Sequence, residues 1–214
     1  MLLKIVMFII FGLPTLFLFL HTIVRIIRHF YKFPIPEFAA DMIDNPLRRK
    51  IQPPAEMPKR HGITPGMKVL EIGPGNGTFT IATAIALGPS GHLTTIDIEP
   101  RMIDRVEQKI LAEGIQNISA RVADVFELPY EKHTFDLIYS IAVIGEIPTP
   151  ERAFLEFYRV LKPEGTLAFS EILMDPDYPL AKTLNSLAQG VGFQLKDRLG
   201  NFFSYSLVFE KQAG

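Results

Sequence analysis

The chain has 214 residues, 48% of them hydrophobic, and its formal net charge is −1 at pH 7. This length can bury one good-sized core with an appendage, and the near-zero charge argues against nucleic-acid partners, whose proteins present a basic field to phosphates. The chain has no cysteine and its five histidines are scattered, so disulfides, cysteine nucleophiles and a metal site are not expected.

The amino-terminal region, residues 1–32, predicts a membrane anchor. Between Ile5 and Val24 there is no Asp, Glu, Lys or Arg, and about twenty apolar residues are enough for a helix to cross a bilayer. The basic residues that follow are Arg25, Arg28, His29 and Lys32, and later Arg48, Arg49 and Lys50. By the positive-inside rule, this pattern predicts a single-pass anchor with the body of the chain on the cytoplasmic side.

A spanning helix has three alternatives. A buried core helix is disfavoured, because such helices are normally amphipathic and shorter. A secretory signal peptide needs a small-residue cleavage site close behind its apolar region, and the nearest one, at residues 38–41, lies well beyond the arginines. A helix lying in the membrane plane is favoured by Thr22–Lys32, which at helical spacing separates basic residues from an apolar face. The basic residues are Arg25, Arg28 and Lys32, and the apolar ones are Ile23, Ile26, Ile27 and Phe30. A span that ends in a basic interfacial turn satisfies both interpretations.

Residues 33–59 are rich in proline, which breaks regular structure. We predict a partly extended linker around one short helix at Pro36–Asn45. The basic cluster in this linker either rests on anionic lipid headgroups or is a solvated surface. The globular body is predicted to occupy residues 60–214.

In that body, short apolar runs rich in β-branched residues alternate with stretches of helical periodicity. Strands are predicted at 67–73, 92–98, 118–125, 134–143 and 165–173, and helices at 78–88, 100–114, 149–165 and 180–189. Residues 192–211 form two β-patterned runs that meet at Gly200 and Asn201, which is typical of an antiparallel hairpin. The pattern predicts an α/β fold: a Rossmann-like, doubly wound, mostly parallel seven-stranded sheet with a carboxy-terminal antiparallel hairpin.

Three glycines follow the first predicted strand in the sequence VLEIGPGNGTFT. Gly73, Gly75 and Gly77 allow a tight turn and close approach of the backbone to a ligand at a helix amino terminus. Asp97 closes the second strand, where an acid typically accepts the hydroxyls of a ribose, so we expect an adenosine-type ligand. The G-x-G-x-G spacing differs from the dinucleotide pattern, and Glu71 opposes a pyrophosphate but suits an ammonium group.

Four segments in this order resemble the class I S-adenosylmethionine-dependent methyltransferases, in particular the type 11 group with its quinone and lipid methyltransferases. The segments are VLEIGPGNGTFT, TTIDIEPRMI, ARVADVFELPY and the run from FDLIYS to TLAFSE. The resemblance covers about Gly62 to Glu171. It implies the fold predicted above and S-adenosylmethionine as the cofactor.

The resemblance also implies which residues hold the methionine end of the cofactor. The backbone of the three glycines packs around the methionine moiety, and Glu71 lies near its amino group. Tyr139 or Ser140, at the end of the fourth strand, approaches the amino-acid portion. Aromatic residues at strand ends are commonly core residues, which is the alternative for Tyr139.

For the adenosine end, the resemblance implies that Asp97 holds the ribose and that Asp124 accepts a hydrogen bond from the adenine amino group. Ile98 and Val125 sandwich the adenine ring. The alternatives are ordinary acids that end strands, for Asp97 and Asp124, and core aliphatic residues, for Ile98 and Val125.

Glu146 is the candidate catalytic residue, because the loop after the fourth strand faces the transferred methyl group in this family. Many relatives have a histidine in this loop, whereas AVIGEIP has a glutamate, and a surface residue that begins a turn is the alternative. The anchor favours a lipid-like acceptor, namely a phospholipid amine or an isoprenoid quinone precursor. The remaining hypotheses are an anchored methyltransferase of a soluble small molecule or protein, and a binding module without catalysis.

Overall fold

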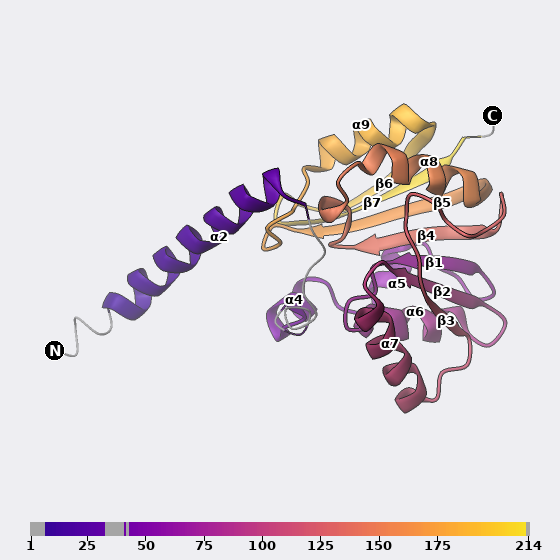
Figure 1. Cartoon of the computed structure of the whole chain (residues 1–214), viewed down its shortest axis with the longest axis horizontal. Helices are drawn as coiled ribbons and strands as arrows, with labels where there is room; N and C mark the ends of the chain where they lie inside the picture. Colours follow the sequence, from indigo (N-terminus) through magenta and orange to yellow (C-terminus); the bar gives the residue numbers. More distant parts are fainter. Residues whose placement is uncertain (1–6, 33–40, 42, 213–214) are drawn as a thin grey trace.

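The computed structural model of the chain describes residues 7–32, 41 and 43–212. A seven-stranded sheet in the order β3-β2-β1-β4-β5-β7-β6 forms its centre (Figure 1). The strands are β1 (Lys68–Ile72), β2 (His92–Asp97), β3 (Ile118–Val122), β4 (Phe135–Ile141), β5 (Leu161–Ile172), β6 (Phe193–Gly200) and β7 (Ser204–Lys211). The first five strands pair in parallel, and β7 runs antiparallel to β5 and β6. The predicted Rossmann-like sheet with its closing hairpin is confirmed.

Strands β1 and β4 form the middle of the sheet because their apolar residues can be covered on both faces. Val69 and Leu70 on β1, and Leu137 and Ile138 on β4, are fully buried. From β1 the chain builds outward to β2 and β3, and then returns to place β4 on the other side of β1. The strand order therefore reverses between β1 and β4, and a crevice at the carboxyl ends of these strands is the usual ligand site of such sheets.

Helices cover both faces of the sheet (Figure 1). One face carries α5 (Met57–His61), α6 (Thr78–Leu87) and α7 (Pro100–Glu113), and the other carries α8 (Pro150–Val160) and α9 (Ala181–Val191). The largest core cluster lies on the second face, where the rings of Phe154 and Phe169 stack with centroids 5.1 Å apart. These two apolar layers pack the helices against the two faces of the sheet. The loops therefore gather at the carboxyl ends of the parallel strands, which we call the carboxyl edge of the sheet.

One helix is shorter than the sequence predicted. The expected helix over 149–165 ends at Val160, and β5 begins at Leu161. Pro163 explains the early end, because proline has no N–H to donate and also disfavours the helical conformation of the residue before it, Lys162.

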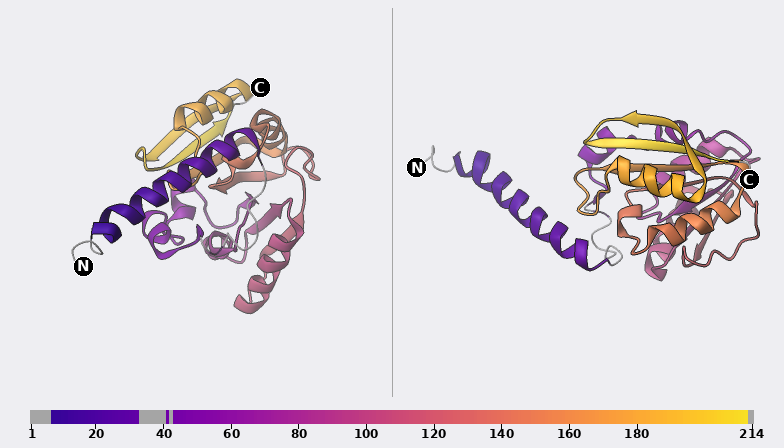
Figure 2. Two further views of the ribbon diagram at one scale, coloured as in Figure 1. Left: turned by 60° about the vertical axis from the view of Figure 1, so that its left-hand side comes forward. Right: turned by 90° about the horizontal axis from the view of Figure 1, so that it is seen from above.

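The amino-terminal helix extends away from the globular domain (Figures 1 and 2). It consists of a π-helical turn, η1 (Phe8–Gly12), followed by α2 (Leu13–Phe30). In the described part of the chain, no helix has both the length and the apolar character needed to cross a bilayer. The predicted span is therefore not supported, and its first two residues, Ile5 and Val6, lie outside the described residues.

The basic residues near the end of α2 contact the globular domain. Arg25 donates a hydrogen bond to the Tyr178 carbonyl, and Arg28 pairs with the buried Asp177 carboxylate. The last turns of α2 are thus attached to the domain.

The region expected to be a linker contains two short helices. Most of the helix predicted at Pro36–Asn45 lies outside the described residues. The described part has α4 (Pro46–Ile51), which begins where the Asn45 side chain accepts the N–H groups of Leu47 and Arg48, and α5, whose Met57 is 1% exposed. Both helices are anchored to the domain by buried side chains.

Phe169→Ala tests the larger core cluster. We expect it to lower the free energy of unfolding by about 3–5 kcal/mol, because it removes a fully buried ring and leaves a cavity against Phe154. Phe203→Ala is the matched control: Phe203 is 67% exposed, so its loss should change stability by less than about 0.5 kcal/mol. Urea unfolding followed by circular dichroism measures both, and equal effects would contradict the core assignment.

Candidate active site

The glycine loop after β1 has the backbone conformation that a ligand cradle requires. Gly73, Gly75 and Gly77 have φ angles of +69°, +56° and +78°, a region that residues with a Cβ rarely adopt. A Cβ at Gly73 would lie 2.6 Å from a methyl carbon of Val143, whereas one at Gly75 would meet nothing within 4 Å. Helix α6 starts directly after Gly77, so its free N–H groups open toward the loop.

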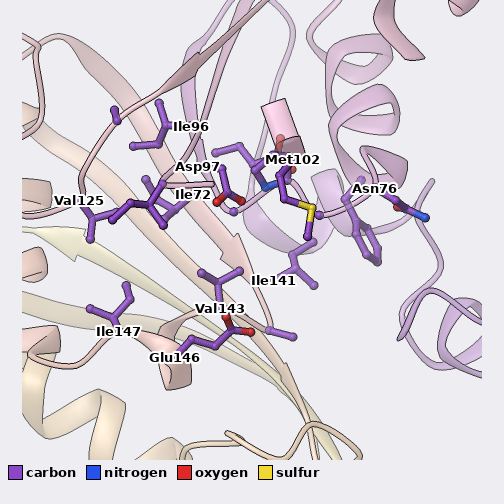
Figure 3. A pocket seen from close by; sticks show the side chains of 18 of the residues that line it. Ile72, Asn76, Ile96, Asp97, Met102, Val125, Ile141, Val143, Glu146 and Ile147 are labelled. Carbon is purple, nitrogen blue, oxygen red and sulfur yellow. The ribbon is translucent and has the colours of Figure 1, made fainter. Parts of the chain in front are cut away.

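The loop borders a cavity of about 270 Å³ at the carboxyl edge of the sheet (Figure 3). Eight of the eleven residues proposed from the sequence line it: Glu71, Gly73, Gly75, Asp97, Ile98, Asp124, Val125 and Glu146. Gly77, Tyr139 and Ser140 do not line it. The predicted residues from four separate strand ends are thus brought to one pocket.

Glu71 is the one ionisable residue among the buried residues of β1, and it lines the pocket. The side chain is 2% exposed in total, and its carboxylate accepts hydrogen bonds from Thr80 Oγ1 at 2.6 Å and from Tyr139 Oη at 2.7 Å. Burial raises the pKa of Glu71, and the two hydrogen bonds act against that rise. A buried carboxylate in this setting fits the ammonium group of a bound cofactor, which would favour its ionised form.

Tyr139 therefore acts on the pocket through Glu71. Burial and the neighbouring carboxylate raise the pKa of Tyr139 well above its ordinary value, so the hydroxyl stays protonated and donates. Ser140, the next residue, is fully buried, and its Oγ has no hydrogen-bond partner within the described residues. The sequence could not separate these two neighbours, but of the two only Tyr139 makes a side-chain hydrogen bond to a pocket residue in the described part of the chain.

The ends of β2 and β3 supply the acids expected at the adenosine end. Asp97 Oδ1 accepts the Glu99 N–H at 2.9 Å, and Asp124 Oδ1 accepts the Phe126 N–H at 2.9 Å. Burial raises the pKa of Asp97. Ile98 is 55% exposed beside the pocket, which is unusual for an isoleucine and fits an aromatic ring stacked on it.

One residue that binds the glycine loop, Asp44, was not predicted from the sequence. The Asp44 carboxylate accepts hydrogen bonds from Asn76 Nδ2 at 2.7 Å, from Thr78 Oγ1 at 2.6 Å and from Arg49 at 2.7 Å. Burial raises the pKa of Asp44, but these hydrogen bonds outweigh it and lower the pKa below its usual value. No local signal marks the contact of Asp44 with the glycine loop, because Asn76 and Thr78 lie more than thirty residues further along the chain, after β1.

The opposite side of the pocket is formed by the loop after β4 and by the end of α2. Glu146 lies 3.8 Å from the Arg28 guanidinium, and its side chain is 14% exposed. Lys32 also lines the pocket, donates to the Gly145 carbonyl and lies 3.2 Å from an Asp177 oxygen. Apolar residues complete this side, namely Ile141, Val143, Ile147 and Pro148. A second molecule bound here would contact mostly hydrocarbon, with one carboxylate and one ammonium group.

The sheet order, the glycine cradle, the buried glutamate and the acids at two strand ends together define a class I methyltransferase that uses S-adenosylmethionine. A family model described as a methyltransferase domain matches residues 63–199. The chain belongs to this family.

Similar proteins of known name are consistent with that assignment. A demethylmenaquinone methyltransferase of Lactobacillus johnsonii is 31% identical over 125 residues, which cover 58% of this chain and 51% of the relative. An arsenite methyltransferase of Halobacterium salinarum is 29% identical over 117 residues, or 55% of this chain and 30% of the relative. The chain therefore matches 51% of the length of the first relative and 30% of the length of the second.

Among solved structures, a SAM-dependent methyltransferase from Aquifex aeolicus superimposes with a TM-score of 0.77 and 19% sequence identity. The superposition covers 83% of this chain and 99% of that one. At this identity, the likeness shows that the fold is shared.

Asp97→Asn tests the adenosine end of the site. We expect S-adenosylmethionine to bind about 10- to 100-fold more weakly, because a charged acceptor of hydrogen bonds from hydroxyls is typically worth about 1.5–3 kcal/mol. Isothermal titration calorimetry measures the affinity. Asp104→Asn, an exposed position on α7, is the matched control, and an Asp97→Asn protein that binds as tightly as this control would contradict the role.

Proposed function

We propose that this methyltransferase transfers the methyl group to a lipid-like acceptor, of the isoprenoid quinone precursor class, at a membrane surface. The observation that carries the proposal is the make-up of one side of the pocket, formed by Ile141, Val143, Ile147 and Pro148, which we call the acceptor side. Its apolar residues adjoin Lys32, which stands two residues beyond the end of a helix with exposed apolar side chains. A lipid-soluble molecule has an apolar route from membrane to pocket in this arrangement.

The exposed surface of α2 supports the membrane part of the proposal. Soluble surfaces rarely present so many contiguous large apolar side chains. Those more than 45% exposed on α2 are Leu13, Leu16, Leu18, Phe19, Leu20, Ile26, Ile27 and Phe30. With its basic residues turned to the domain, the helix offers this surface to lipid.

The relatives bear on the acceptor. A demethylmenaquinone methyltransferase is by its name an enzyme of a quinone precursor, and an apolar acceptor side suits such a molecule. Arsenic(III) is a soft ion that soft thiolate ligands would hold, and this chain has no cysteine to supply one. This favours the quinone class over arsenite. A phospholipid amine would be the second lipid acceptor, because Glu146 could face its cationic headgroup.

The residues of the chain bind and orient the two reactants. When bound, S-adenosylmethionine supplies an electrophilic methyl group on a positively charged sulfur. Glu71 holds the ammonium end, Asp97 the ribose, and the glycine loop leaves room for the backbone to approach. Alignment of the acceptor with the methyl group can contribute several kcal/mol to catalysis. Glu146 takes up the proton that the acceptor loses.

Labelling of membranes tests the class of acceptor. Membranes that contain the protein are incubated with methyl-labelled S-adenosylmethionine and then partitioned into organic, aqueous and protein fractions. We expect label in the organic phase that is lost with Asp97→Asn and kept with Asp104→Asn. Label confined to the aqueous or protein fraction would instead support a soluble acceptor, and no label in any fraction would support a module without catalysis.

Glu146→Gln tests the proposed base. We expect kcat to fall about 100-fold or more, because a positioned general base typically contributes 10²- to 10⁴-fold, while the affinity for S-adenosylmethionine is kept. The acidic limb of the pH–rate profile should also disappear. Glu151→Gln on the exposed first turn of α8 is the matched control. A Glu146→Gln enzyme with normal kcat and an unchanged pH profile would show that Glu146 only begins a turn.

A further inference from the structure

The connection between β6 and β7 displays two aromatic side chains on a rigid turn. Gly200 takes a left-handed conformation with φ +88°. Asn201 then closes the turn, because its side-chain oxygen accepts the N–H of Phe203 at 2.8 Å and its own N–H donates to the Ser204 carbonyl at 2.8 Å. Phe202 is 56% exposed and Phe203 is 67% exposed. We call these two residues the hairpin tip.

The loop that follows β5 holds the hairpin tip in place from behind. The Leu173 N–H donates to the Phe203 carbonyl at 2.8 Å, and the Tyr178 hydroxyl donates to the Phe202 carbonyl. The rings of Tyr178 and Phe202 meet edge to face with centroids 6.1 Å apart. The same loop exposes two further apolar side chains, Met174 and Leu180. The tip is thus an ordered surface whose aromatic rings remain open to the surroundings.

Tyr178 also connects the hairpin tip to the amino-terminal helix. Arg25 of α2 donates to the Tyr178 carbonyl at 3.0 Å, and its guanidinium lies 6.0 Å from the centre of the Tyr178 ring. Tyr178 therefore contacts both α2 and Phe202. Figures 1 and 2 show α2 leaving the domain at the edge where the β6–β7 connection lies.

The sheet topology places the same edge at the pocket. Because β7 runs antiparallel to β5, the start of β7 lies beside the end of β5, where Ile172 pairs with Ser204. The carboxyl ends of the parallel strands, the hairpin tip and the end of α2 consequently share one edge of the domain. The pocket lies at this edge too, since Asp97 ends β2 and Glu146 follows β4.

We propose that the hairpin tip is a second membrane contact, in which Phe202 and Phe203 enter the interfacial region of the bilayer that α2 binds. The inference rests on the proposed function, and it adds an orientation to it. With both contacts made, the carboxyl edge of the sheet faces the lipid, and the acceptor side of the pocket opens toward the membrane surface. A lipid-like acceptor then reaches the pocket without crossing water.

Charge and side-chain chemistry favour a lipid bilayer as the occupant. Aromatic side chains partition well into the membrane interface, and neighbouring basic residues attract anionic headgroups. Arg25 and the exposed Arg198 both lie close enough to Tyr178 to affect its ionisation. An isolated aromatic pair would suit a protein groove equally well, but this pair is linked to α2 through Tyr178, which contacts both Arg25 and Phe202. The apolar side chains of α2 are exposed on more than one side of the helix, because Leu18, Phe19 and Leu20 are consecutive, which a single protein groove would not cover.

Single tryptophans can report the contact, because the chain has no tryptophan of its own. We would prepare the full-length variants Phe202→Trp and Phe203→Trp and mix each with phosphatidylcholine–phosphatidylglycerol vesicles that carry bromine on the acyl chains. Phe19→Trp on α2 reports membrane association itself. Leu111→Trp is the matched control, because Leu111 is 80% exposed near the end of α7 at the opposite edge of the sheet.

The expected result is bromine quenching and a blue shift at positions 19, 202 and 203, with neither at position 111. Quenching at 19 but not at 202 or 203 would overturn this inference and leave membrane association intact. Absence of quenching at all four positions would overturn both the inference and the membrane part of the proposed function. A shift at 202 that depends on protein concentration without vesicles would assign the surface to a second copy of the chain and also overturn the inference.

The charge contribution has its own test in the Phe202→Trp background. Arg198→Gln should weaken vesicle binding about fivefold at high phosphatidylglycerol content, since one basic residue near an anionic surface is worth about 1 kcal/mol. Lys132→Gln, an exposed position before β4 at the opposite edge, is the matched control. Equal binding by the two variants would overturn the proposed headgroup contact.

Discussion

The buried carboxylate of Glu71 is the constraint on which the site depends. It stands on the central strand and accepts hydrogen bonds from Thr80 on α6 and Tyr139 on β4. A buried carboxylate without partners costs several kcal/mol, so these three elements are held in one register. That register fixes the glycine turn between β1 and α6. The same carboxyl group lines the pocket, and therefore one group both organises the site and presents an acidic side chain to a bound ligand.

A second buried carboxylate, Asp177, joins the amino-terminal helix to the domain. It pairs with Arg28 and Lys32, while its backbone packs so closely on Gly145 that a Cβ there would lie 2.0 Å from the Asp177 carbonyl oxygen. Buried ion pairs contribute little net stability, since desolvation offsets their attraction. The effect of this one is positional: it fixes Lys32 and the loop of Glu146 beside each other, so the end of α2 becomes a wall of the pocket.

Much of the globular domain could be predicted from short-range patterns. The apolar run around Val69, the glycine at position 73 and the acid at position 97 are local signals, because strand burial, turn conformation and strand-end polarity are set by adjacent residues. Local patterns failed where distant residues meet. Tyr139 and Ser140 look equivalent in the sequence, but the parallel register places Tyr139 opposite Glu71, and Asp44 reaches the glycine loop only in the folded chain.

The sequence by itself determined the order of strands and helices, the closing hairpin and the cofactor class, because periodicity and motif spacing depend only on residues that are close together in the chain. Only the tertiary structure decided what the basic end of the amino-terminal helix contacts. In the sequence Arg25 and Arg28 follow an apolar run and resemble a membrane flank, whereas in the fold both contact the loop of Asp177 and Tyr178. The physical reason is that the partner of a charged side chain depends on what the fold brings within a few ångströms of it, and these partners lie about 150 residues away along the chain.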